Sequence, residues 1–165
     1  MHAYHAASWE SFFVAEAGAS AALAGLLFVA ISINLNRILE FPSLPGRAAE
    51  TIVILVNALV IASVGLMPGQ SNTALGLEVL VLATATWAVV MSLQYRNSRH
   101  PVEANEHSRG ARFLLTQVVI VPFIVGGVTI AAEAGGGLYW VGAGMVVTFI
   151  AAALTAWVLL VEIMR

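Results

Sequence analysis

The chain has 165 residues, of which 60% are hydrophobic and only 10% are charged, with a formal net charge of −2. Soluble domains carry about 25% charged residues, so this composition excludes a soluble globular protein and predicts a membrane protein. All seven basic residues are arginine and all nine acidic residues are glutamate. The lack of cysteine excludes disulfides, thiolate metal sites and cysteine nucleophiles.

Five apolar stretches follow one another along the chain. Each is long enough to cross a hydrocarbon core of about 30 Å as a helix that rises about 1.5 Å per residue. They predict helices over residues 11–35, 48–67, 74–95, 113–133 and 138–164. Pro42 and Pro45 separate the first two helices, and residues 96–112 form a polar link between the third and the fourth. We expect a single integral membrane domain over residues 1–165, an all-α bundle of five transmembrane helices.

All the arginine residues fall on one side of an alternating five-pass topology. They lie in the first link, in the third link and at the C-terminus: Arg37, Arg47, Arg96, Arg99, Arg109, Arg112 and Arg165. The positive-inside rule therefore predicts that the N-terminus lies outside the cell and that the C-terminus lies in the cytoplasm. Aromatic side chains favour membrane interfaces, so we expect Tyr4, Trp9, Tyr139 and Trp140 at the outer boundary.

Two of the predicted helices carry small residues at a spacing of four. They are Ala17, Ala21 and Gly25 in the first helix, and Gly144, Thr148, Ala152 and Ala156 in the last. In lipid, this spacing lets two helix backbones approach closely. We expect both helices to use these residues for packing inside the bundle, with a contact between subunits as the alternative.

Three glutamates fall in the outer part of the membrane under this topology, namely Glu16, Glu78 and Glu133. No basic side chain lies on that side to neutralise them. Carboxylates without basic partners at low dielectric take up a proton or bind a cation, so the three form a candidate cation or proton site. The alternatives are that Glu133 is solvated at the headgroups, that Glu78 favours the positive end of its helix, and that Glu16 bonds another helix.

The N-terminal segment offers a weak candidate metal site, because His2, His5 and Glu10 combine imidazole with carboxylate, which suits Zn, Cu or Fe. A solvated tail explains the same residues, and we expect neither a metal nor a cofactor. None of the four histidines falls within a predicted helix, which argues against a haem-carrying subunit.

Polar residues inside the predicted spans are costly and should find partners. Asn57 and Gln117 are the candidates for intramembrane hydrogen bonds, with a role in a transport pathway as the alternative for Asn57. We expect the Trp87 N–H to bond another helix or another subunit. Glu50, at the inner end of its helix, should pair with an arginine.

Residues 9–39 (WESFFVAEAGASAALAGLLFVAISINLNRIL) and the following PGRAAE resemble uncharacterised small multi-pass bacterial membrane proteins. The resemblance implies a bacterial inner-membrane protein and no function. No catalytic motif is present, and the mixed charges of the polar link do not suit nucleic acid. The sequence therefore predicts a non-enzymatic protein that contacts the lipid bilayer and is a homo-oligomer or an accessory subunit of a larger membrane complex. The alternative function is a cation or proton channel or transporter that uses the outer glutamates.

Overall fold

A computed structural model describes residues 2–41, 44–97 and 106–164. In this part of the chain the structure is all-helical, without strands. Two short 3-10 helices, η1 (His2–Tyr4) and η2 (Ala6–Trp9), precede α1 (Glu10–Ile33), α2 (Leu35–Glu40) and α3 (Leu44–Gly65). Then follow α4 (Asn72–Asn97), α5 (Glu106–Ala131) and α6 (Leu138–Met164).

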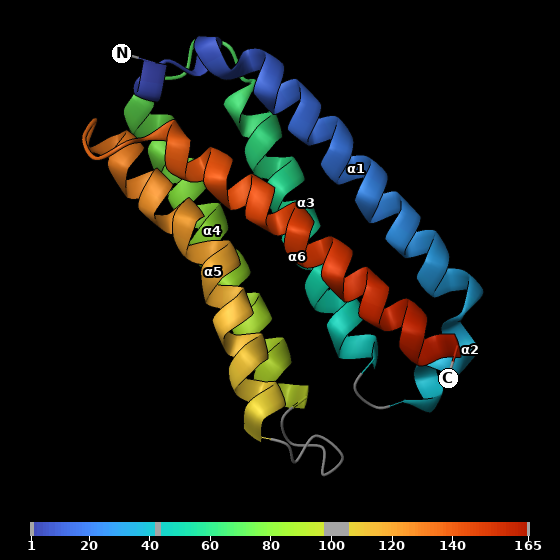
Figure 1. Cartoon of the computed structure of the whole chain (residues 1–165). Helices are drawn as coiled ribbons and strands as arrows, with labels where there is room; N and C mark the ends of the chain where they lie inside the picture. Colours follow the sequence, from blue (N-terminus) through green and yellow to red (C-terminus); the bar gives the residue numbers. More distant parts are fainter. Residues whose placement is uncertain (1, 42–43, 98–105, 165) are drawn as a thin grey trace.

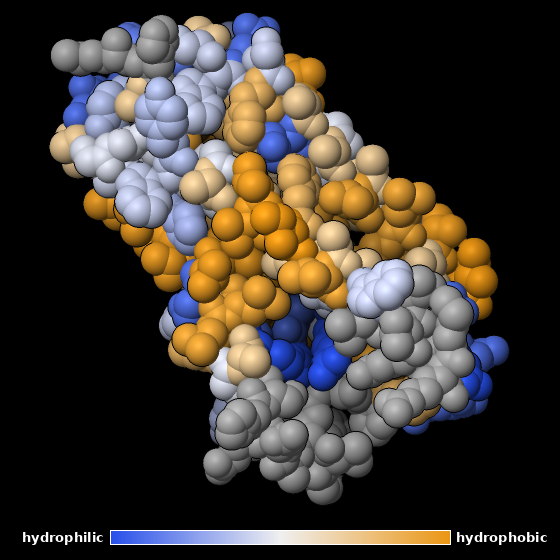
Figure 2. Space-filling model, viewed as in Figure 1, coloured by the Kyte–Doolittle hydropathy of each residue, from blue (hydrophilic) through white to orange (hydrophobic). Residues whose placement is uncertain are grey.

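Five of the described helices are long and apolar enough to cross a membrane, namely α1, α3, α4, α5 and α6. The prediction of an all-helical chain with five such helices is confirmed. Apolar side chains dominate the middle of the face shown in Figure 2. This pattern is the one expected of helices whose outer surfaces contact lipid.

The short links differ from the sequence-based prediction in two regions, the first link and the third. In the first link, α3 begins at Leu44 instead of residue 48, so Pro45 lies within its first turn. The first predicted helix is interrupted at Asn34, and the chain continues as α2, which was expected to be loop. Ile38 explains this turn of helix, because its side chain is buried against Leu44, Leu55 and Ala152. In the third link, α5 begins at Glu106, so part of the predicted polar link is helical.

The helices alternate in direction (Figure 1), so the N-terminus, the α3–α4 link and the α5–α6 turn share one end of the bundle, which we call the aromatic end. The start of α3, the end of α4 and the start of α5 share the other end, which we call the arginine end. Arg37, Arg47, Arg96 and Arg112 all belong to elements at the arginine end. Arg99 and Arg165 lie outside the described residues.

Among the described helices, α4 and α5 make the most extensive contact, and one glycine from each lies at that contact. A Cβ on Gly76 would lie 2.7 Å from the carbonyl oxygen of Gly127, and a Cβ on Gly127 would lie 2.9 Å from that of Gly76. Any side chain at either position would therefore force the two backbones apart. Gly76 and Gly127 lie on different helices, so no pattern of small residues within one helix predicts their contact.

The last helix packs through the residues predicted for it. Thr148 is fully buried, Ala152 is 6% exposed, and a Cβ on Gly144 would touch the Phe123 ring at 3.0 Å. Ala156 packs at the edge of the same core as Ala152. This face of α6 therefore lies against α5 and α3, across which α6 runs in Figure 1.

The first helix packs through a different face from the one predicted. Its buried residues are Phe13, Glu16, Ser20 and Leu27, and they lie against α3. Ala17 is half-buried, but Ala21 and Gly25 are exposed, and a Cβ on Gly25 would meet nothing within 4 Å. Packing inside the bundle is therefore wrong for these two residues.

Candidate functional site

At the aromatic end, the N-terminal segment packs against the turn between α5 and α6. The Gly136 N–H donates to the Tyr4 hydroxyl at 3.1 Å, across a sequence separation of 132 residues. The Trp9 and Tyr139 rings meet edge to face with centroids 4.9 Å apart. Tyr4 and Trp9 therefore dock on the α5–α6 turn and the start of α6, and the expected interfacial aromatic residues do gather at one end.

The structure gives two of the three candidate carboxylates an amide partner. Glu78 accepts a hydrogen bond from the Gln70 side chain, and Glu133 accepts one from the Asn72 side chain at 2.9 Å. Both amides belong to the α3–α4 link or to the first residue of α4. Glu133 itself is exposed and adopts a φ of 50°, which fits its place in the α5–α6 turn.

Glu16 has a different environment. It is 9% exposed and lies on the face of α1 that packs against α3. Ser20, one turn further along the same face, is fully buried. Among the residues that the structure describes, no hydrogen-bond partner reaches Glu16 Oε2 or Ser20 Oγ. A buried polar atom without a partner costs about 1–3 kcal/mol. Glu16 and Ser20 therefore lower the stability of the contact between α1 and α3.

The weak candidate metal site is not assembled by the described residues. His5 and Glu10 are exposed, and the side chain of His2 lies outside the described part. Within that part, no group of three or more histidine and glutamate side chains could hold a metal ion together. Glu16, Glu78 and Glu133, all of them described, therefore do not form such a group either.

The intramembrane amides bond neighbouring helices. Asn57 on α3 accepts a hydrogen bond from the Thr86 hydroxyl on α4 at 3.0 Å. The Trp87 N–H donates to Gln117 Oε1 on α5 at 3.2 Å. These two bonds tie α4 to both of its neighbours, as polar residues in lipid-embedded helices commonly do.

A charged network lies nearer the arginine end. Arg112 Nη2 on α5 forms an ion pair with Glu50 Oε1 on α3 at 2.6 Å. Gln94 on α4 donates to Glu50 Oε2 at 3.3 Å and to the Thr116 hydroxyl at 2.7 Å. The expected pairing of Glu50 with an arginine is therefore present. Gln94 and Thr116 were not predicted to belong to this network, since nothing in the sequence joins residues from three helices.

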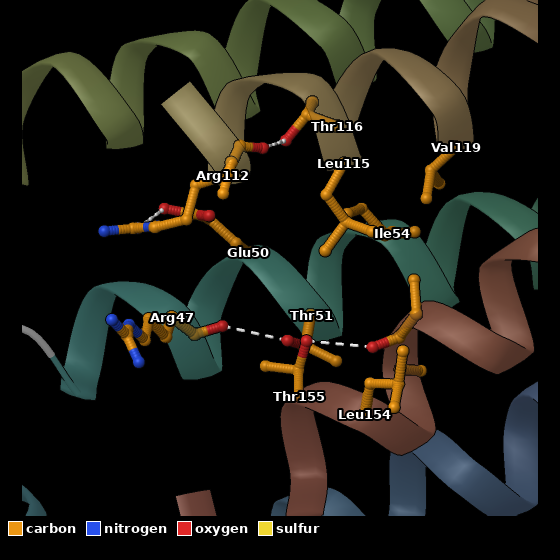
Figure 3. Close-up of a pocket in the computed structure, with 13 residues that line it drawn as sticks. Arg47, Glu50, Thr51, Ile54, Arg112, Leu115, Thr116, Val119, Leu154 and Thr155 are labelled. Atoms are coloured by element: carbon orange, nitrogen blue, oxygen red, sulfur yellow. Dashed lines mark hydrogen bonds and ion pairs between the residues drawn. The ribbon is translucent and has the colours of Figure 1, made fainter. Parts of the chain in front are cut away.

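This network borders a cavity of about 310 Å³ between α3, α5 and α6. Arg47, Glu50 and Arg112 line it at one end, and Ile54, Leu115 and Val119 are among the apolar residues of its wall. Figure 3 shows Arg47, Glu50 and Thr51 along α3 opposite Arg112 and Thr116 on α5, with Thr155 of α6 beside Thr51. The arrangement can bind a small charged group, because it combines fixed charges with a low-dielectric wall.

Comparison of the chain with family models, with curated proteins and with solved structures finds no match.

Proposed function

We propose that the protein is a non-enzymatic integral membrane protein whose function depends on assembly, with a second copy bound at the outer face of α1. The observation that carries this proposal is the set of small residues exposed on that face. They are Gly18, Ala21, Ala22 and Gly25. A Cβ built on Gly18 or on Gly25 would meet nothing within 4 Å, so within the described part of the chain nothing packs on either glycine.

The exposed glycines have a physical cost that packing against another helix would offset. Glycine in a helix interior is less favourable than alanine by about 1 kcal/mol. Small residues spaced by four on a lipid-facing surface allow a second helix to approach closely, and close packing is a main source of helix association in lipid. On α1, Gly18 with Ala22 and Ala21 with Gly25 have that spacing.

The position of α1 also supports the proposal. It is the least buried of the five candidate spans, and it packs chiefly on α3 at one side of the bundle (Figure 1). One side of α1 is thus free to meet another chain. In the proposed orientation, the arginine end faces the cytoplasm of a bacterial inner membrane and the aromatic end faces outside.

The proposal is tested by the mass of the purified full chain in mild detergent, measured by native mass spectrometry. We expect a dimer or a larger homo-oligomer. Replacement of Gly18 and Gly25 together by leucine should give the monomer, since the added side chains hold the second helix away. Ala19→Leu places a leucine side chain at an exposed position outside this set and should leave the oligomer intact.

A wild-type chain that is monomeric and binds no other protein would overturn the proposal. If the wild-type chain instead co-purifies with another membrane protein in a fixed ratio, and the double leucine variant loses it, the same face binds a different subunit. In that case the protein would be an accessory subunit of a larger membrane complex and not a homo-oligomer.

A second candidate function, uptake of protons or cations, is favoured by the environment of Glu16. A buried carboxylate oxygen without a described partner is a functional candidate in a spanning helix. In liposomes that contain the purified chain, a proton or cation flux abolished by Glu16→Gln would support this function. Glu10→Gln, which alters an exposed carboxylate on the same helix, is the control. A flux that Glu16→Gln leaves unchanged contradicts it.

A further inference from the structure

The cavity at the arginine end changes from charged to apolar along α3 and α5, two of the three helices that line it. On α3 the lining runs from Arg47 to Ile54, and on α5 it runs from Arg112 to Val119. Each pair spans seven residues, or about 10 Å along the helix. Since α6 runs in the opposite direction to α3 and α5, Thr155 lies toward the charged end and Ala151 lies deeper. The cavity therefore has one charged end and one apolar end.

Among the described residues that line the charged end, positive charge exceeds negative charge. They include two arginines and one glutamate, which together carry a formal charge of +1 at neutral pH. Glu50 is 8% exposed and is held by Arg112 and Gln94. Because a guanidinium carries five N–H donors in a planar arrangement, one arginine can bind a protein carboxylate and a ligand anion together.

The threonine hydroxyls of the lining do not supply the anion with donors. Thr51 donates to the Arg47 carbonyl at 2.9 Å, and Thr155 donates to the Ala151 carbonyl at 2.9 Å. The charged donors at this end are therefore the guanidinium groups of Arg47 and Arg112. Arg47 also lies in the first turn of α3, where the backbone N–H groups add positive potential.

The cavity opens on the side of the bundle. Figure 2 views the helices from the side, and it shows a hollow with strongly hydrophilic side chains at its back and apolar side chains above it and to its left. A ligand can thus enter from the plane of the membrane. The volume of about 310 Å³ is at the lower end of the range for small-molecule sites, enough for a headgroup and the first part of a chain.

We propose that this cavity binds an acidic membrane lipid, with its anionic headgroup at Arg47 and Arg112 and its first methylene groups against Ile54, Leu115 and Val119. An amphiphile matches both ends of the cavity, whereas a soluble anion matches only the charged end. Basic pockets between helices at the cytoplasmic side are suited to acidic headgroups. The proposal does not depend on the oligomeric state, because α1 contributes no residue to the cavity.

The test is lipid binding to the purified full chain in detergent, followed by native mass spectrometry. Phosphatidylglycerol and phosphatidylcholine with the same acyl chains are the probes. We expect phosphatidylglycerol to bind at least fivefold more tightly, and Arg47→Gln to weaken it about fivefold, since one arginine near an acidic headgroup is worth roughly that factor. Arg96→Gln removes an exposed arginine at the same end but outside the cavity, and should change binding by less than twofold.

A second pair of variants tests the apolar end without a change of charge. Leu115 is 41% exposed and lines the cavity, so Leu115→Trp should fill part of it and weaken phosphatidylglycerol binding at least fivefold. Val118→Trp places the same ring at an exposed position of α5 outside the lining and should leave binding unchanged. The melting temperature of each variant confirms that it is folded.

Three outcomes would overturn the proposal. The first is equal binding of the two lipids. The second is an equal effect of Arg47→Gln and Arg96→Gln, or of the two tryptophan variants, which would mean that lipid binds the general surface. The third is displacement of phosphatidylglycerol by glycerol phosphate at a comparable concentration, which would make the cavity a site for a soluble anion.

Discussion

Arg112 of α5 and Glu50 of α3 form an ion pair with 2.6 Å between Nη2 and Oε1, and their side chains are only 17% and 11% exposed. The pair closes one end of the cavity and joins two helices that are separated by a complete further helix in the sequence. Loss of one partner leaves the other charge at low dielectric, which is more costly than loss of both.

We therefore expect Arg112→Gln to lower the free energy of unfolding by about 3 kcal/mol. The double variant Glu50→Gln with Arg112→Gln should recover a large part of this loss, because no buried charge then lacks a partner. Unfolding followed by tryptophan fluorescence in detergent provides the measurement. A double variant no more stable than Arg112→Gln would show that the pair has no coupling of this kind.

The glycine contact between α4 and α5 makes a second prediction. Gly76→Ala places a Cβ 2.7 Å from the Gly127 carbonyl oxygen, so the two backbones must separate and stability should fall by about 1–3 kcal/mol. Gly110→Ala is the matched control, because a Cβ there meets nothing within 4 Å. The thermal melting temperatures of the two variants should differ clearly, with only Gly76→Ala below wild type.

The bond between Asn57 and Thr86 should contribute a measurable coupling energy between α3 and α4. Asn57→Leu, Thr86→Val and the double variant form a double-mutant cycle. We expect a coupling of about 0.6 kcal/mol and at most about 1.7 kcal/mol, the range found for hydrogen bonds between membrane helices. If the stability lost in the double variant equals the sum of the losses in the two single variants, the coupling is zero and the hydrogen bond is contradicted.

The Tyr4 hydroxyl should hold the N-terminal segment on the α5–α6 turn. Tyr4→Phe removes the acceptor of the Gly136 N–H and should weaken docking of this segment by about 1 kcal/mol. Faster amide hydrogen exchange at residues 3–9 and at the turn is the expected result. Tyr139→Phe removes a hydroxyl from an exposed ring at the same end and should not change the exchange.

The sequence by itself determined the number of long apolar helices and the gathering of arginine at one end. Both follow from local composition, because a span of about 20 apolar residues and its charged flanks are visible within one segment. The sequence also predicts that Glu50 pairs with an arginine, because Glu50 lies near the end of α3 where the arginines gather. The exact partner, Arg112, depends on the tertiary structure.

Only the tertiary structure decided which face of each helix lies inside. In a soluble protein the hydrophobic side of a helix marks the core, but a membrane helix is apolar toward both the core and the lipid. The same sequence pattern of small residues is therefore buried on α6, at Gly144 and Thr148, and exposed on α1, at Ala21 and Gly25. The contact of Gly76 with Gly127 and the cavity beside Glu50 likewise arise only when separate helices come together.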